Sequence, residues 1–235
     1  MNKITCSLLL MCLLLACKEA EKEHSHDDGV TTHSDSENNP AGAKDTLEAK
    51  RIEQTEYSPA YIQHATGIEI IPDLKTAVTS NGVLTHEGIF GPLLFGEKIR
   101  SFFIELQPGM FLSEHPHPTE SMVYTVSGRW VLCSEGKRQL MEPGSVFHFG
   151  SDIPTGWEAP FNEKALLYIV KTKIDGESYE PFTKGLLDMA KTLNEEKANG
   201  TVFYFNALHP DHPAVLFGRK INPEFDMMLA NIKNK

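Results

Sequence analysis

Basic residues are scarce in this sequence relative to acidic ones. It has 22 Lys and Arg against 32 Asp and Glu, which gives a formal net charge of -10 at pH 7 and a pI of about 5.5. Proteins that bind nucleic acid or anionic lipid through charge present a basic patch. The excess of acid therefore argues against nucleic acid as a partner and against electrostatic attachment to a membrane.

Long hydrophobic runs are also absent, apart from one near the start. The apolar run from Ile4 to Leu15 follows the basic start Met1-Asn2-Lys3. It is too short to span a bilayer and has the length of a signal-peptide core. The run ends Leu14-Leu15-Ala16-Cys17, which resembles the lipobox of bacterial lipoproteins. The resemblance implies a signal peptide over 1–16 and a lipid on Cys17 that anchors the protein to a membrane. The alternative is an ordinary signal peptide with a chance cysteine.

Cysteine is rare and badly placed for disulfides. Cys6 and Cys12 would leave with the signal peptide and Cys17 would carry the lipid, so Cys133 alone remains free. No disulfide is then expected within the mature chain. The residues Lys18 to Glu21 resemble the surface-export signal of lipoproteins in the Bacteroidota. Both sides of the outer membrane, surface and periplasm, remain open as the location of this cell-envelope protein.

Apolar side chains are few between the anchor and the folded region. Residues 17–44 are rich in Glu, Asp, Ser, Thr, Asn and His, and they cannot bury enough surface to offset their ordering entropy. They are predicted to form a disordered tether. Residues 45–67 are predicted to form a helical lead-in, with Ser58-Pro59 starting and Gly67 ending its second helix.

Short apolar or alternating runs, broken by turn residues, fill residues 68–173. This pattern predicts a mainly β fold, one sandwich or barrel, and the 40% hydrophobic content is enough for a core. Residues 174–235 are predicted to form a helix-and-strand extension. Within it we expect a helix over 186–198, strands over 201–206 and 215–221, and a short helix from Pro223.

Two histidines one residue apart mark the most informative stretch, Gly109 to Gly128. His115 and His117 would point to the same face of an extended strand. Both imidazoles can then reach one point inside a barrel. No second copy of this stretch occurs, so the sequence predicts one barrel and not two.

The spacing Gly109, five residues, His115, Pro116, His117 and then Gly128 resembles the first motif of the cupin superfamily. Pro143-Gly144-Ser145, with a strand and Ile153 to Trp157 after it, resembles the second motif in degenerate form. The resemblance covers about residues 70–173. It implies a single cupin-type barrel, a double-stranded β-helix or jelly roll, with short helices before it and an α/β extension after it.

The sequence departs from the cupin pattern at two ligand positions. In typical metal cupins the first motif supplies two His and one Glu, and the second supplies one His. Counting back from Gly128 places Ser121 where the Glu belongs, with Glu120 one residue early; Thr155 stands at the last His position. A divalent transition metal held by His115 and His117, with Glu120 brought in through a bulge, is one interpretation. The other is a barrel that has lost its metal and keeps the histidines as pocket-lining residues.

Four further residues are predicted to line a ligand pocket: Ser121, Tyr124, Thr155 and Trp157. His148 is expected to face outward, because Phe147 and Phe149 beside it have the inward phase of the strand. Cys133 is expected to be a buried hydrophobic residue, since no catalytic partner set surrounds it.

Two functions follow from the resemblance. The first is an envelope-anchored protein that binds a small molecule in its barrel. The alternative is a metal-dependent cupin enzyme that acts on a carbohydrate or another small organic substrate, and the residues do not decide whether the protein is an enzyme. A homodimer is expected only on the general ground that symmetric dimers are the commonest assembly.

Overall fold

The computed structural model describes residues 61–233. The predicted signal peptide, the lipid-bearing Cys17, the tether and residues 45–60 of the lead-in lie outside the described residues. Among the described helices, none is both long and apolar enough to cross a membrane.

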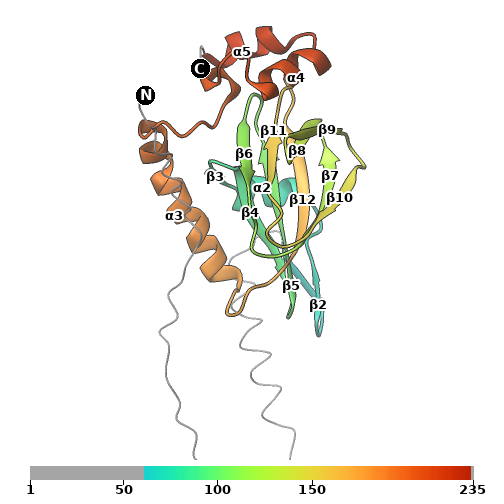
Figure 1. The fold of residues 1–235 in the computed structure, drawn as a ribbon. Coiled ribbons are helices and arrows are strands. Elements are labelled where there is room, and N and C mark those ends of the chain that lie inside the picture. The colour runs from blue at the N-terminus through green and yellow to red at the C-terminus, as the bar shows by residue number, and fades with distance from the viewer. Residues whose placement is uncertain (1–60, 234–235) are drawn as a thin grey trace, which may run out of the picture. The chain divides into compact units, whose positions relative to one another are not determined.

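Two antiparallel sheets form the body of the protein (Figure 1). The larger sheet has the strand order β10-β7-β12-β5-β4-β3. Its strands are β3 (Val83–Thr85), β4 (Gly88–Phe95), β5 (Ile99–Leu106), β7 (Ser121–Ser127), β10 (Val146–Phe149) and β12 (Ala165–Thr172). The smaller sheet has the order β6-β11-β8-β9. Its strands are β6 (Phe111–His115), β8 (Trp130–Ser134), β9 (Lys137–Met141) and β11 (Thr155–Glu158).

The main hydrophobic core fills the space between these sheets. Alternate residues of each strand point into it, as the period of a half-buried strand requires. On β12 the inward residues are Ala165, Leu167 and Ile169, and on β5 they are Phe102, Ile104 and Leu106. Trp130 and Trp157 contribute the two largest side chains from the smaller sheet.

The helix α3 (Tyr179–Ala198) packs along β3 and β4 (Figure 1). It contributes Phe182, Leu186 and Met189 to the main core. These residues lie on one face of the helix at spacings of four and three. The helix therefore covers the larger sheet near its β3 edge, and the main core extends beneath the helix.

The C-terminal residues form a second, smaller core. The 3₁₀ turn η1 (Phe205–Ala207) and the helices α4 (Pro213–Ile221) and α5 (Phe225–Lys233) pack their apolar side chains around Phe111 at the start of β6. The segment between α3 and η1 also pairs with this start, through a bridge between Met110 and Tyr204 and a bond from the Phe111 amide to the Phe203 carbonyl, 2.8 Å. The free edge of β6 is thus covered where the strand begins.

Three local predictions are corrected by the structure. Residues 62–65, expected in the helical lead-in, form strand β1 (Ile62–Ala65), which pairs with β2 (Ile68–Ile70). Gly67, with φ of 74°, serves the turn of this hairpin and not a helix end. The predicted strands of the extension do not form, because 215–221 is part of α4, 201–203 is irregular, Tyr204 makes one isolated bridge and η1 begins at Phe205. A further helix, α2 (Leu74–Asn81), was not expected, although Asp73 caps it with bonds to the Lys75 and Thr76 amides.

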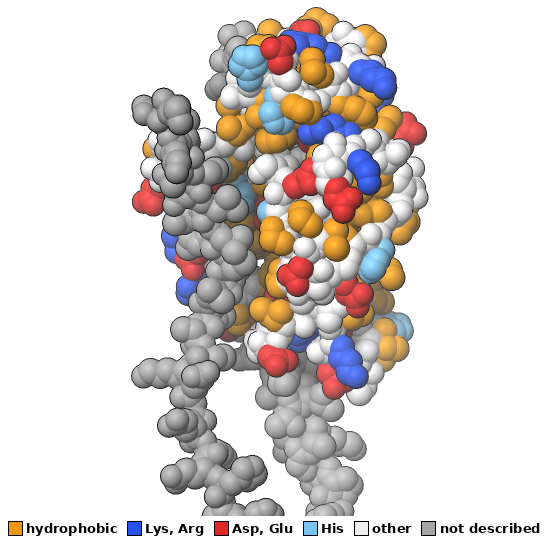
Figure 2. Space-filling view, in the orientation of Figure 1, with side chains coloured by type: hydrophobic (Ala, Val, Ile, Leu, Met, Phe, Trp, Pro, Cys, Tyr) orange, Lys and Arg blue, Asp and Glu red, His pale blue; other side chains and the backbone are white. Residues whose placement is uncertain are grey.

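Acidic and basic side chains are interspersed on the face seen in Figure 2, with hydrophobic side chains between them. Thirteen large hydrophobic residues of the described chain are substantially exposed, among them Met122, Tyr124 and Val146 on the outer face of β7 and β10.

Candidate functional site

The two histidines come together at the end of the barrel where β6 stops. His115 is the last residue of β6 and lies opposite Thr155, the first residue of β11. Pro116 separates it from His117, and the carbonyl of His117 accepts a bond of 2.7 Å from the Asp152 amide. The centroids of the two imidazole rings are 4.5 Å apart. We call this end of the barrel the His end.

His117 is buried between aromatic rings. Its ring centroid lies 4.9 Å from that of Phe149 and 6.1 Å from that of Trp157. Its Nε2 lies 2.9 Å from the Thr155 hydroxyl, the group that replaces a histidine of the cupin pattern. Burial, followed by the positive charge of Lys171 and then by His115, lowers the pKa of His117 to about 3. His117 is therefore neutral at physiological pH.

His115 is less buried and makes a different contact. Its Nδ1 lies 3.1 Å from the Ser113 carbonyl oxygen. A carbonyl can only accept, so Nδ1 of His115 donates this hydrogen bond. Of the two imidazoles, only that of His115 has an Nε2 that no residue of the described chain engages.

The donor set at the His end does not fit a typical metal site. No group of three His, Cys, Asp or Glu side chains comes together among residues 61–233. Structural and catalytic sites for divalent metals use three or four protein ligands. One of the two imidazoles here, that of His117, is already engaged at Nε2 by the Thr155 hydroxyl.

Glu120 does not supply the missing ligand. It is exposed on the outside of the barrel, where its carboxylate lies 3.4 Å from Nε2 of His148. His148 is exposed and Phe149 buried, as the strand phase predicted. No bulge turns Glu120 inward, so this candidate ligand is corrected by the structure.

Ser121, and not Glu120, points into the barrel. The alternation of inward and outward residues along β7 follows from this. Ser121, Val123 and Thr125 are buried, whereas Met122 and Tyr124 are exposed, Tyr124 to 43%. The prediction that Tyr124 lines the pocket is wrong, because it lies three residues from Ser121 and alternation turns it outward.

Two buried polar atoms at the His end have no hydrogen-bond partner in the described chain. They are Oγ of Ser121 and Nε1 of Trp157. Their side chains are 2% and 4% exposed. Buried polar atoms are almost always satisfied, and leaving one without a partner costs about 1–3 kcal/mol. The second tryptophan differs, since Trp130 Nε1 donates to the Thr125 hydroxyl at 2.9 Å.

A buried lysine lies beside Ser121 and was not predicted from the sequence. Lys171 continues the inward alternation of β12 and is 7% exposed. Its Nζ lies 5.9 Å from the centroid of Phe149. Burial, and then the charge of Arg100, lower the pKa of Lys171 to about 8, against a smaller raising effect of Glu87. The signal was present in the strand pattern Ala165, Leu167, Ile169, whose next inward position is Lys171.

Arg100 lies opposite Lys171 on β5 and has its own partners. It forms an ion pair with Glu177, and its guanidinium lies 4.6 Å from the ring centroid of Phe182 on α3. Burial lowers the pKa of Arg100 to about 10. The charge of Arg100 is thus neutralised beside α3.

Cys133 contacts Glu114 and neither of the two histidines. Its thiol donates to Glu114 at 2.9 Å, and the Gly136 amide donates to the same oxygen. Burial and the Glu114 contact raise the pKa of Cys133 to about 12. A thiol so rarely ionised is a poor nucleophile, in agreement with the prediction of a buried hydrophobic residue.

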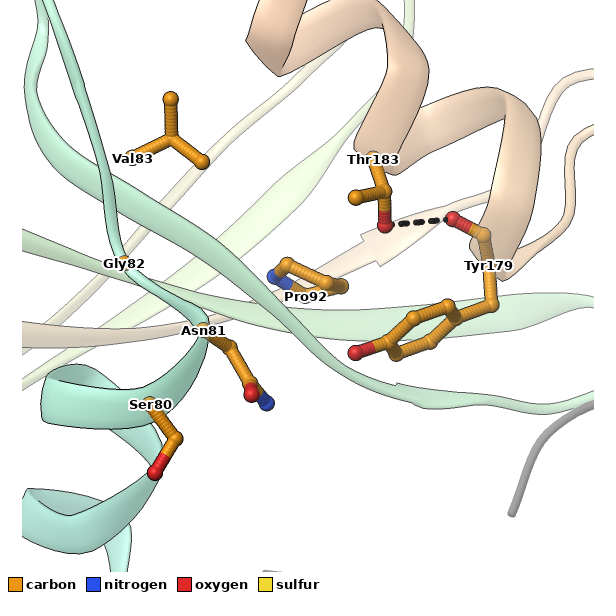
Figure 3. A pocket seen from close by; sticks show the side chains of 7 residues that line it. All are labelled: Ser80, Asn81, Gly82, Val83, Pro92, Tyr179 and Thr183. Atoms are coloured by element: carbon orange, nitrogen blue, oxygen red, sulfur yellow. Dashed lines mark hydrogen bonds between the residues drawn. The ribbon is translucent and has the colours of Figure 1, made fainter. Parts of the chain in front are cut away.

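Two hollows on the described surface lie away from the His end. One of about 210 Å³ lies between α2, β4 and α3 (Figure 3). The Tyr179 ring points across it toward Asn81, and the Thr183 hydroxyl donates to the Tyr179 carbonyl at 2.8 Å. The other, of about 370 Å³, is lined by Gly136, Arg138, Pro213, Leu216, Phe217 and Lys220. Neither is lined by a residue that the sequence predicted for the site.

Comparison with known proteins identifies the barrel. Residues 102–171 match the family described as "Cupin domain". This range holds both motifs, so the described barrel is a cupin domain and has the cupin fold. Among curated protein sequences, none matches this chain.

Several solved structures are similar to part of this chain. The Cupin 2 conserved barrel domain protein from Salinispora arenicola is 18% identical, with a TM-score of 0.39, and the match covers 52% of this chain and 97% of that one. The Cupin_2 domain of an XRE family transcriptional regulator from Enterobacter cloacae is 24% identical, with a TM-score of 0.34 and coverage of 37% and 96%. A predicted oxalate decarboxylase from Thermotoga maritima is 24% identical, with a TM-score of 0.34 and coverage of 36% and 79%.

Proposed function

We propose that this cupin domain binds a small molecule at its His end, and that lipid on Cys17 holds the protein at the cell envelope. One observation carries the first part: two buried polar atoms, Trp157 Nε1 and Ser121 Oγ, lie without partners beside the histidine pair. A ligand that accepts a hydrogen bond from the indole and bonds the hydroxyl removes both costs. Small-molecule sites combine apolar walls with a few such polar groups.

The aromatic surroundings support an organic ligand. The His117 ring is tilted against that of Phe149 and stacked on that of Trp157, at centroid distances of 4.9 and 6.1 Å. Rings contribute large apolar contact area to a bound molecule. The neutral state of His117 adds a group that accepts or donates according to its tautomer, with no charge to desolvate.

Binding is favoured over the alternative, a metal-dependent enzyme acting on a carbohydrate or another small organic substrate. That alternative needs a third protein ligand near His115 and His117, and the described residues that were candidates point elsewhere: Glu120 lies outside and Thr155 is a hydroxyl bonded to His117. No catalytic step is therefore derived through a metal.

The two tryptophans provide a test with a built-in control. Full-length protein, labelled with ¹⁵N at its indoles and held in detergent, is titrated with a library of small organic molecules. We expect binders to shift the Trp157 indole resonance and to leave that of Trp130 in place. The Trp157→Phe variant should weaken the affinity about threefold to tenfold, because it removes one hydrogen bond. Trp130→Phe should leave it unchanged.

The outcome that contradicts the proposal is a library in which no compound shifts Trp157. The metal content of untagged protein tests the alternative at the same time. We expect no stoichiometric metal. An equimolar metal that disappears in a His115→Ala, His117→Ala variant would replace the proposal with the metal-dependent enzyme.

A further inference from the structure

The interior of the barrel contains one positive charge that no acidic residue of the described chain balances. Lys171 lies on the inward face of β12, in line with Ala165, Leu167 and Ile169 of the main core. It is 93% buried, since its exposed fraction is 7%. Lysine is almost never buried to this extent without a partner, because its ammonium loses its hydration.

No carboxylate in the described chain forms an ion pair with Lys171. The ion pairs of residues 61–233 include Arg100 with Glu177 and His86 with Glu87 and Glu196, but none with this lysine. Glu87 is the only acid that favours its charged form, and it does so from beyond ion-pair distance. The ammonium instead faces the ring of Phe149.

The groups around the ammonium form a small polar patch within an aromatic wall. Ser121 is the register partner of Lys171 on the neighbouring strand β7. Both point inward, and paired residues on one face have Cβ atoms about 4.5–5.5 Å apart. The Ser121 hydroxyl has no partner in the described chain. His117 is close enough for the charge of Lys171 to act on it more strongly than His115 does.

The charge balance selects the class of ligand. Arg100 is neutralised by Glu177, so the imbalance amounts to one positive charge. A metal cation would be repelled by the ammonium, whereas one negative charge would balance it. A dianion such as phosphate would leave a buried negative charge in excess.

We infer that the ligand of the His end is a small organic acid with one carboxylate, which pairs with the Lys171 ammonium and accepts a hydrogen bond from the Ser121 hydroxyl. The inference rests on the proposed function, since it names the class of molecule that binds there. The organic part of the acid lies against Phe149, Trp157 and the imidazoles. The carboxylate supplies the counter-ion that residues 61–233 do not.

The experiment compares acids with their uncharged amides. Full-length ¹⁵N-labelled protein in detergent is titrated at pH 7 with acetate, lactate and benzoate, and with acetamide, lactamide and benzamide. The readouts are the Trp157 indole and the Lys171 side-chain resonances. We expect at least one acid to bind at millimolar concentration and to shift both resonances, and its amide to bind at least about 30-fold more weakly.

Variants separate the charge from the fold. Lys171→Met should weaken the acid at least about 30-fold, and Ser121→Ala about threefold to tenfold. Lys164→Met is the matched control, because Lys164 lies just before the same strand, is exposed and pairs with Glu105. It should leave binding unchanged. Lys171→Arg keeps the charge and should keep the preference for acid over amide.

Each result separates the inference from the proposed function. Amides that shift Trp157 as well as their acids do, with no effect of Lys171→Met, overturn the inference and leave the proposed function standing. Shifts of Trp157 by neither class overturn the inference for these acids, and the wider library decides the proposed function. Tight acid binding that survives Lys171→Met also overturns the inference.

Discussion

Lys171 is a single residue that destabilises the folded protein at the proposed ligand site. The residue is 7% exposed and its ammonium has no ion-pair partner among residues 61–233, so the folded protein disfavours the charged form. Two charged groups act on it: Arg100 on β5, which lowers its pKa, and Glu87 in the turn before β4, which raises it. Binding sites commonly retain such destabilising groups because function requires them.

Replacing Lys171 with methionine should therefore stabilise the ligand-free protein. Methionine keeps the length of the chain and removes the buried charge, so the free energy of unfolding at pH 7 should rise by on the order of 2 kcal/mol. Urea unfolding followed by circular dichroism measures this. A fall in stability would show that the ammonium has a partner or solvation that the structure does not reveal.

The same variant has a defined pH dependence. The pKa of Lys171 is about 8 in the folded protein and 10.5 as the ordinary value. Between these values the unfolded chain binds more protons, so the stability of the unaltered protein rises with pH. The advantage of Lys171→Met should thus be full below pH 8 and should shrink as the pH approaches 10.5.

The candidate site was only partly predictable, and the reasons are local. Motif spacing located the histidine pair, and counting placed Ser121 and Thr155 where they meet it. Spacing alone did not give the phase of β7, so Tyr124 was placed inside although alternation from Ser121 turns it outward. Lys171 was missed because a lysine ordinarily marks the end of a buried strand.

At the scale of elements, α3 is the part of the chain that most extends the core. Its Leu186 is 3% exposed within the main core, and the neighbouring Leu187 is 47% exposed. Phe182, one turn earlier, packs against Phe90, Phe95 and Phe102 at centroid distances of 5.5–5.7 Å. The helix is therefore held by one apolar face.

This pair of leucines gives a matched test of the packing of α3. Leu186→Ala should lower the free energy of unfolding by about 2–4 kcal/mol, because it leaves a cavity in the core. Leu187→Ala should change it by less than about 0.5 kcal/mol. Urea unfolding of both variants measures the difference. Equal effects would mean that α3 does not pack on the barrel as described.

The elements show the limit of reading secondary structure from short apolar runs. The β-type pattern of residues 68–173 correctly predicted a barrel of short strands. Residues 215–221 were interpreted as a strand, yet the buried residues of α4, Ala214, Val215 and Gly218, have helical spacing. Pro213 in the first turn and the His212 ring, which accepts from the Ala214 amide, start that helix.

At the scale of the whole molecule, the proposed lipid on Cys17 determines where the barrel is found. Cys17→Ala should move the protein from the membrane fraction to the soluble fraction, and it should abolish incorporation of labelled fatty acid. Cys133→Ala is the matched control, because its thiol is buried against Glu114, and it should leave both unchanged. Membrane association that persists in Cys17→Ala would contradict the anchor. Protease treatment of intact cells separates the surface from the periplasmic face.

The covered start of β6 has a consequence for the order in which the protein matures. The strand that leads to the histidine pair is an edge of its sheet, and residues 203–205 cap the beginning of that edge. An uncovered edge strand is a template for pairing with other chains. During synthesis the chain emerges from its N-terminus, so the cap at residues 203–205 arrives after every strand of the barrel. The edge of β6 therefore stays open to self-association until the cap has been made. Truncation that removes the cap should yield aggregates in preference to a smaller working domain.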